Sequence, residues 1–188
     1  NTHVVGDLPF MSYQVSIDEA LRNAGRLLKE GGCQSVKLEG GVSSQETVSA
    51  IVESGIPVMG HIGLTPQSVN QLGGYRVRGK TEDEADQLIS DAIALEEAGA
   101  YSIVLELIPS RLASQITSRV NIPTIGIGAG PNCSGQVQVF HDILGLFPDF
   151  APKHARRYSE LGAEAQTAVS KYIADVKSGD FPSIAESS

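Results

Sequence analysis

The chain has 188 residues, of which 41% are hydrophobic and 19% are charged, and 14 Lys and Arg against 22 Asp and Glu give a formal net charge of −8. This composition is typical of one globular domain with a core, and it excludes disorder along the whole chain. The acidic balance argues against a basic nucleic-acid surface, and no apolar run approaches the roughly 18–20 residues of a membrane-spanning helix. We therefore expect a protein that binds neither nucleic acid nor membrane.

The two cysteines, Cys33 and Cys133, are too few for a disulfide-stapled scaffold. A reducing compartment is the default expectation for such a chain. Cys33 precedes a candidate strand and is expected to pack as a small apolar residue, whereas Cys133 is expected in an exposed loop. Neither has a pattern around it that is typical of a nucleophile.

The first predicted helix follows Ser16, which has Glu19 three residues later in a capping-box pattern. Gly31 and Gly32 predict its end. Its apolar residues recur at helical spacing: Ile17, Ala20, Leu21, Ala24, Leu27 and Leu28. The segment 35–39 that follows reads as a short strand ended by glycines.

The same alternation of strand and helix continues along the chain. Ser43 with Glu46 and Thr81 with Glu84 form two more capping-box patterns, and a shorter helix is predicted over about 110–119. A last helical region is predicted from Pro152 to about Lys177. Six candidate strands end near Gly6, Glu39, His61, Glu106, Gly128 and Phe140.

Strands that alternate with capped helices predict successive βαβ units and an α/β fold with a parallel sheet. Six strands fit an open doubly wound sheet or most of a (β/α)₈ barrel. A complete barrel typically needs about 250 residues, so the barrel interpretation requires two βα units to be missing at the N-terminus. We expect one domain over residues 1–178 and a mobile tail over 179–188.

Ligand sites in parallel α/β folds lie at the carboxyl ends of the strands. The polar residues at those positions are Asp7, Lys37, Glu39, His61 and Glu106. Carboxylates such as Asp7 and Glu39 are oxygen ligands that Mg²⁺ accepts. Glu106 is flanked by apolar residues on both sides, a setting suited to general acid/base chemistry.

Each of these residues also has a structural interpretation that the pattern leaves open. Asp7 could be a turn residue, Lys37 and Glu39 could form an ion pair within one strand, and His61 could be a hydrogen-bonded structural residue. The glycine-rich turn at 126–130 could bind an anion or only permit a tight turn, because a lone glycine-rich loop is weak evidence.

Several segments together resemble the ketopantoate hydroxymethyltransferase family in the same order along nearly the whole chain. They are Gly6-Asp7-Leu8-Pro9-Phe10-Met11, Val36-Lys37-Leu38-Glu39-Gly40-Gly41, Gly60-His61-Ile62-Gly63-Leu64-Thr65-Pro66-Gln67, Gly73-Gly74-Tyr75, Leu105-Glu106, Ile125-Gly126-Ile127-Gly128-Ala129-Gly130 and His141-Asp142. The resemblance implies a (β/α)₈ TIM barrel of the phosphoenolpyruvate/pyruvate type. It begins only at the family's third strand, so the first two βα units, with a Gly-Asp-Ser segment that supplies another metal-site aspartate, are expected to be missing.

Residue by residue, the resemblance implies that Asp7 and Glu39 hold Mg²⁺. It implies that Asp7, Lys37 and His61 bind the oxoacid substrate and that Glu106 is the catalytic acid/base. The implied reaction is transfer of a one-carbon unit from 5,10-methylenetetrahydrofolate to 3-methyl-2-oxobutanoate through a Mg-stabilised enolate. The product is 2-dehydropantoate, in pantothenate and coenzyme A biosynthesis.

The resemblance further implies a homo-oligomer, a decamer in the family, and a cytoplasmic location, or a mitochondrial one if the source is eukaryotic. Two alternatives stay open from the sequence. One is a carbon–carbon lyase of a related oxoacid barrel, which would share the metal and enolate chemistry but need no folate. The other is a catalytically incomplete fragment that only assembles with other chains.

Overall fold

The computed structural model describes residues 2–187, apart from the side chains of residues 71 and 72. The chain divides into two compact units, residues 1–137 and residues 138–188, which are described separately. The single domain expected over residues 1–178 stays a prediction.

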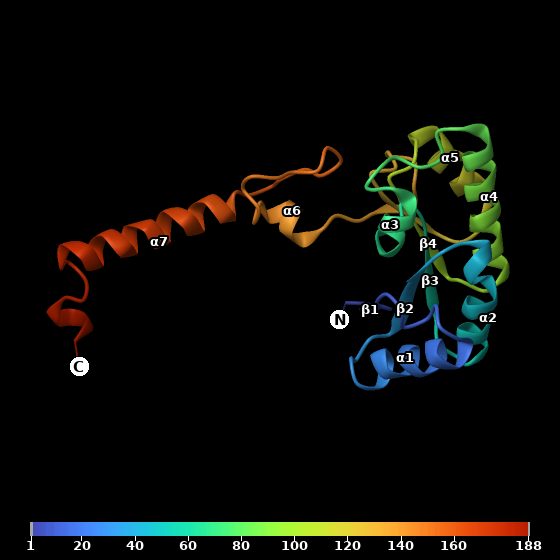
Figure 1. Ribbon diagram of the computed structural model, residues 1–188, viewed down its shortest axis with the longest axis horizontal. Coiled ribbons are helices and arrows are strands. Elements are labelled where there is room, and N and C mark those ends of the chain that lie inside the picture. The colour runs from blue at the N-terminus through green and yellow to red at the C-terminus, as the bar shows by residue number, and fades with distance from the viewer. Residues whose placement is uncertain (1, 188) are drawn as a thin grey trace. The chain divides into compact units, whose positions relative to one another are not determined.

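The first unit alternates strands and helices in the predicted order (Figure 1). Its elements are β1 (Val5–Asp7), α1 (Ile17–Lys29), β2 (Ser35–Glu39), η1 (Val42–Ser44), α2 (Gln45–Glu53), β3 (Val58–Gly63), η2 (Pro66–Ser68), α3 (Val69–Leu72), α4 (Glu82–Glu97), β4 (Ser102–Glu106), α5 (Ser110–Arg119), β5 (Thr124–Ile127) and β6 (Gly135–Gln136). The second unit contains α6 (Phe140–Leu144), α7 (Leu161–Ser178) and η3 (Ile184–Glu186).

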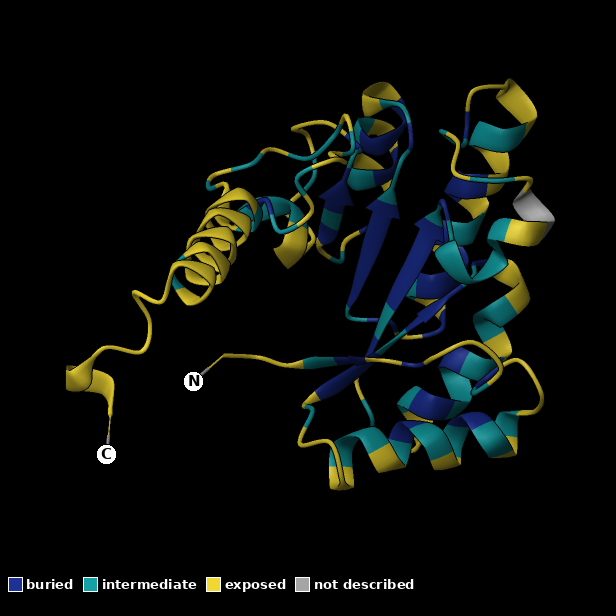
Figure 2. Cartoon of the chain, turned by 60° about the vertical axis from the view of Figure 1, so that its left-hand side comes forward, coloured by how far each residue is buried: buried dark blue, intermediate teal, exposed yellow. Residues whose placement is uncertain are grey.

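The six strands form one parallel sheet in the order β1-β2-β3-β4-β5-β6. This confirms the predicted parallel α/β architecture. Because β1 and β6 stand at opposite ends of the order, residues 2–187 contain an open sheet and not a closed eight-stranded barrel. The central strands are almost wholly buried (Figure 2), which agrees with their continuous apolar sequence.

At two of the three predicted helix starts the N-cap is confirmed, although the return bond of the capping box, from the N-cap N–H to the Glu side chain, is not among the bonds of the described residues. The Oγ of Ser16 accepts a hydrogen bond from Glu19 N, and Oγ1 of Thr81 accepts one from Glu84 N. The prediction for Ser43 is wrong, because the short helix η1 comes first and α2 begins after Ser44 without a side-chain cap. The Ser44 hydroxyl instead donates to the carbonyl of Glu39, which closes the turn at the end of β2.

The last predicted strand is shorter than expected. The pattern of residues 136–140 alternates as a strand would, but β6 ends at Gln136 and Phe140 is in α6. Only one further ladder bond follows, from Val137 N to the carbonyl of Gly126. The partner strand β5 ends at Ile127, so no further backbone remains to extend the pairing.

In the second unit, α7 begins later than predicted. Residues 152–160 are not part of the long helix, and Arg157 there donates to the carbonyls of Phe147, Pro148 and Phe150. The apolar stripe of α7 is largely exposed in Figure 2, with Tyr172 at 55%. No helix within residues 2–187 is long and apolar enough to cross a membrane.

Cys133 differs from its predicted exposure. It is partly buried and packs against the core, and its Sγ occupies the space beside Gly126 that a larger residue there would need. Burial raises the pKa of the Cys133 thiol, which lowers the fraction of reactive thiolate at neutral pH.

Candidate active site

The sheet register brings the five predicted site residues to one face. Asp7 pairs with Lys37, Glu39 with His61, and Gly63 with Glu106. Because side chains alternate between the two faces of a strand, residues that are paired or two apart share a face. Asp7, Lys37, Glu39, His61 and Glu106 therefore all lie on the same face, at the carboxyl ends of four neighbouring strands.

The opposite face of the sheet is covered by helices. Gly6 lies against Leu27 of α1, and Gly60 lies against Leu95 of α4. Figure 1 shows α1, α2 and α4 following one another along that side. The absence of side chains at these two glycines lets the helices approach the sheet closely, on the face opposite to the charged residues.

Lys37 links the first strand to the third. Its Nζ lies 2.8 Å from Oδ1 of Asp7 and 3.3 Å from Nδ1 of His61. The side chain of Lys37 is 18% exposed and that of Asp7 is 54% exposed, so the ion pair is at the solvent side of the cluster. Two of the structural alternatives do not match these contacts. Asp7 is not only a turn residue, because it pairs with Lys37, and Lys37 contacts Asp7 and His61 on neighbouring strands.

The contact with Lys37 assigns the proton on His61. An ammonium group only donates, so neutral His61 accepts at Nδ1 and carries its hydrogen on Nε2. That Nε2 lies 3.1 Å from Oε2 of Glu106, but the pair is poorly aligned, and Nε2 has no hydrogen bond among the described residues. A buried donor with this geometry is available to a substrate oxygen that enters beside Glu106.

Glu39 is a buried carboxylate in this cluster, 6% exposed. Its Oε2 accepts a hydrogen bond from Gln67 N at 3.0 Å, and its Oε1 lies 3.9 Å from Nδ1 of His61. Burial raises the pKa of Glu39, while His61, in its protonated form, and the ammonium of Lys37 act in the opposite direction. The group is therefore held where a bound cation would relieve the cost of its charge.

Two residues that support Glu39 were not predicted. The hydroxyl of Tyr13 accepts from Glu39 N at 3.2 Å and donates to Oε1 of Gln67 at 3.0 Å. The Gln67 side chain in turn donates to the carbonyl of Leu8 at 2.8 Å. The loop after β1, the end of β2 and the segment after β3 are thus bonded to one another around one carboxylate. Gln67 belongs to a segment that carries the family resemblance, but no pattern in the sequence pairs it with Tyr13.

The donor set suits Mg²⁺ in type but is small. Within residues 2–187, no group of three or more His, Cys, Asp or Glu side chains is arranged as a metal site. Asp7 and Glu39 supply two carboxylates, and the charge of Asp7 acts on Glu39. Mg²⁺ is commonly held by one or two carboxylates with water and substrate in the remaining positions, so the residues present fit this ion.

The glycine-rich turn at 126–130 has a packing explanation. Gly130 has a φ of +81°, and a Cβ there would collide with Ser110 at the start of α5. Glycine is thus required by the backbone conformation and by the close approach of α5. The second of the two interpretations, a tight turn, accounts for these glycines.

The sequence relationships of the chain agree with this cluster. The family model described as Ketopantoate hydroxymethyltransferase matches residues 1–184. The chain belongs to this family. A 3-methyl-2-oxobutanoate hydroxymethyltransferase of Dehalococcoides mccartyi is 58% identical over 184 residues, which are 98% of this chain and 65% of that protein. One of Clostridium beijerinckii is 56% identical over 182 residues, 97% of this chain and 66% of that protein.

Among solved structures, a putative phosphonomutase from Burkholderia cenocepacia J2315 has a similar fold. The TM-score is 0.53 at 15% sequence identity, with 95% of this chain and 70% of that chain covered. The likeness supports the α/β barrel-like arrangement of the six strands. The chain spans about 65% of the length of the Dehalococcoides relative.

Proposed function

We propose that this chain carries the enolising site of a 3-methyl-2-oxobutanoate hydroxymethyltransferase. The reaction transfers the methylene carbon of 5,10-methylenetetrahydrofolate to C3 of 3-methyl-2-oxobutanoate, takes up water, and yields 2-dehydropantoate and tetrahydrofolate. The observation that supports this most is the cluster of Lys37, His61 and Glu106 on one face, in a chain 58% identical to a protein of that name.

Asp7 and Glu39 would hold Mg²⁺. When bound, the metal would withdraw charge from the carboxylate and keto oxygens of the oxoacid, which makes its C3 proton more acidic. Lys37 places a second positive charge within 2.8 Å of Asp7. Its ammonium is therefore suited to bind the anionic end of the oxoacid beside these carboxylates.

Glu106 is the proposed base for the C3 proton. Its side chain is 15% exposed, so a substrate can reach the carboxylate while most bulk water is kept away from it. In this step the C3–H bond breaks, the proton passes to Glu106, and the electron pair moves to the keto oxygen. The unpaired Nε2–H of His61 is suited to donate a hydrogen bond to that developing oxygen charge.

The same proposal covers four properties of the whole protein. We propose a complete (β/α)₈ barrel of the phosphoenolpyruvate/pyruvate type, a bound folate donor, self-association into a homo-oligomer, and a cytoplasmic location. The open six-stranded sheet supports the first of these, because its strands follow one another in the order of such a barrel.

The test is proton NMR of 3-methyl-2-oxobutanoate in D₂O with this chain, with and without Mg²⁺ and without folate. We expect Mg²⁺-dependent loss of the C3 proton signal, and Glu106→Gln should slow this loss by about 10²–10⁴-fold. Glu97→Gln, at an exposed position of α4, is the matched control.

Three results would change the proposal. Wild-type chain without any exchange would contradict an enolising site in these residues. Exchange that persists in Glu106→Gln, together with lost condensation, would move Glu106 to protonation of the folate donor. Condensation that proceeds equally well without methylenetetrahydrofolate would contradict the folate assignment.

A further inference from the structure

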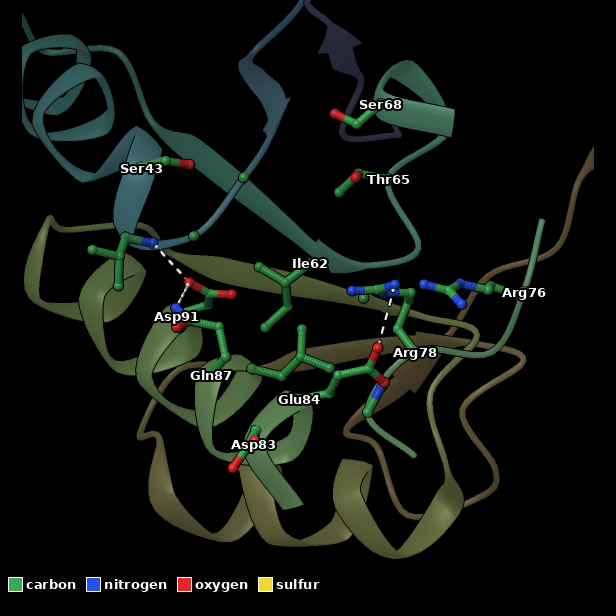
Figure 3. Close-up of a pocket in the computed structure, with 16 residues that line it drawn as sticks. Ser43, Ile62, Thr65, Ser68, Arg76, Arg78, Asp83, Glu84, Gln87 and Asp91 are labelled. Atoms are coloured by element: carbon green, nitrogen blue, oxygen red, sulfur yellow. Dashed lines mark hydrogen bonds and ion pairs between the residues drawn. The ribbon is translucent and has the colours of Figure 1, made fainter. Parts of the chain in front are cut away.

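A cavity lies on the helix-covered face of the sheet, on the other side of the sheet from the charged cluster. Its volume is about 870 Å³, which is within the usual range of about 300–1,000 Å³ for sites that bind small molecules. Ile62 lines it. Because Ile62 follows His61 on β3, its side chain points to the opposite face of the sheet. Figure 3 shows Ile62 in the middle of the cavity.

One wall of the cavity contains both of its arginines, Arg76 and Arg78, from the most basic stretch of an acidic chain. Asp83 and Glu84 also line the cavity. Arg78 is paired with Glu84 at 3.4 Å, and Glu84 also accepts from the backbone N–H groups of Gly79 and Lys80. Among the described side chains, Arg76 has no hydrogen bond or ion pair. Arg76 is therefore the cation available to an anionic ligand.

The wall across from Arg76 in Figure 3 contains Asp91 of α4. Its Oδ1 accepts from Val42 N at 2.9 Å and from Gln87 Nε2 at 3.0 Å. Among the described residues its Oδ2 has no partner, so it can accept from the N–H groups of a ligand. A side chain at Gly41 would collide with Asp91, so glycine there keeps the carboxylate close to the β2 rim.

The cavity and the charged cluster share their rim. Thr65 and Ser68 line the cavity, and Gln67 between them donates to Glu39 on the other side. At the end of β3, Gly63 has no side chain and lies directly against the backbone of Glu106. The backbone N–H of Arg78 donates to the carbonyl of Leu107, the residue after Glu106. A ligand that lies across Gly63 is thus next to both sites.

We propose that this cavity binds the one-carbon donor as an amphoteric ligand. The hydrogen-bond-donating pterin ring lies at Asp91, the apolar middle crosses Ile62 and Gly63, and the carboxylate tail lies at Arg76. This assignment rests on the proposed function for the identity of the donor. The cavity's own chemistry, an unpaired cation facing an unpaired carboxylate oxygen across an apolar floor, specifies a ligand with an acidic end and an N–H-donating end.

Calorimetric titration with two probes tests the two ends separately. Tetrahydrofolate carries both the ring and the glutamate tail, whereas 6-methyltetrahydropterin carries only the ring. The titrations are made without oxoacid and without Mg²⁺, so that binding is independent of the reaction. We expect Arg76→Gln to lower the affinity for tetrahydrofolate by about three- to tenfold and to leave the affinity for 6-methyltetrahydropterin unchanged.

Asp91→Asn should lower the affinity for both probes by a similar factor, because both carry the ring that is proposed to lie at Asp91. Its amide oxygen still accepts from Val42 N, so the loop contact is kept. Lys80→Gln removes the same charge from the same stretch, but Lys80 does not line the cavity. It is therefore the control for long-range attraction of an anion, and it should bind both probes like the wild type.

Four outcomes would overturn the inference. In the first two, the wild type does not bind tetrahydrofolate, or Asp91→Asn binds both probes with unchanged affinity. In the other two, Arg76→Gln loses affinity equally for both probes, or Lys80→Gln loses as much affinity for tetrahydrofolate as Arg76→Gln does. Folate-free C3 exchange of the oxoacid by the wild type is measured in parallel. Exchange with the wrong binding pattern rejects only the cavity assignment, whereas the expected binding pattern without exchange rejects the enolising site.

Discussion

The ammonium of Lys37 lies 3.3 Å from Nδ1 of His61 and fixes which nitrogen of the imidazole carries the hydrogen. With Nδ1 accepting, Nε2 carries the proton and faces Glu106. Lys37→Met should remove this preference. In ¹⁵N NMR of histidine-labelled chain, we expect one ring nitrogen of wild-type His61 to be protonated and the other not, and the variant to show a mixture of tautomers. An unchanged spectrum in Lys37→Met would contradict the assignment.

Tyr13→Phe should destabilise the fold more than an ordinary loss of one tyrosine hydroxyl. The change leaves the buried N–H of Glu39 without its acceptor, for an expected cost of about 1–3 kcal/mol. Tyr101→Phe is the matched control, because its hydroxyl bonds to Ser35 at a partly exposed position, for about 0.5–1.5 kcal/mol. Urea denaturation measures both, and a Tyr13→Phe cost no larger than the control's would argue against the network.

Gly63→Ala should be strongly destabilising. The residue has a φ of +96°, and an added Cβ would collide with the carbonyl of Glu106. We expect a loss of about 2 kcal/mol or more in unfolding free energy. Gly25→Ala in the middle of α1 is the control, since a Cβ there meets nothing within 4 Å. It should stabilise the chain by about 0.5–1 kcal/mol, and a similar effect of both substitutions would contradict the close contact at Gly63.

Glu39→Gln should stabilise the metal-free chain at neutral pH. Burial raises the pKa of Glu39 in the folded state above its value in the unfolded chain. The protonated carboxyl therefore contributes its full stability below the unfolded-state pKa, and this contribution is lost as the pH rises through the folded-state pKa. Thermal unfolding in EDTA should show a higher Tm for the variant at pH 7, by a few degrees, and convergence with the wild type towards pH 4. A lower Tm for the variant at pH 7 would show that the charges of Lys37 and His61 outweigh burial.

The strand-end residues could be found from the sequence because their position follows from topology. Parallel strands bring their carboxyl ends to one edge, so Lys37, His61 and Glu106 had to come close once the alternation of strands and helices was recognised. The N-caps of α1 and α4 could also be predicted from the sequence, because each is a bond between a side chain and a backbone N–H only three residues apart.

The features that were missed depend on contacts between distant segments. Tyr13, in the loop after β1, meets Gln67, in the segment after β3, and no local pattern relates them. The Ser43 cap was wrong because the turn after Gly40 uses Ser44 to bond the end of β2. The strand predicted to reach Phe140 stopped early because its partner β5 ended. In each case the deciding interaction belongs to tertiary structure.

The burial of Tyr13 also gives this protein an optical reporter at its candidate site. The chain has five tyrosines and no tryptophan, so its near-ultraviolet signal above 270 nm comes mainly from phenol rings. Tyr13 is 5% exposed, and burial raises its pKa to about 12, against an ordinary value of about 10. The phenolate absorbance of Tyr13 should therefore develop last in an alkaline titration. Difference absorbance and near-ultraviolet circular dichroism can then follow events beside Glu39 without any added label.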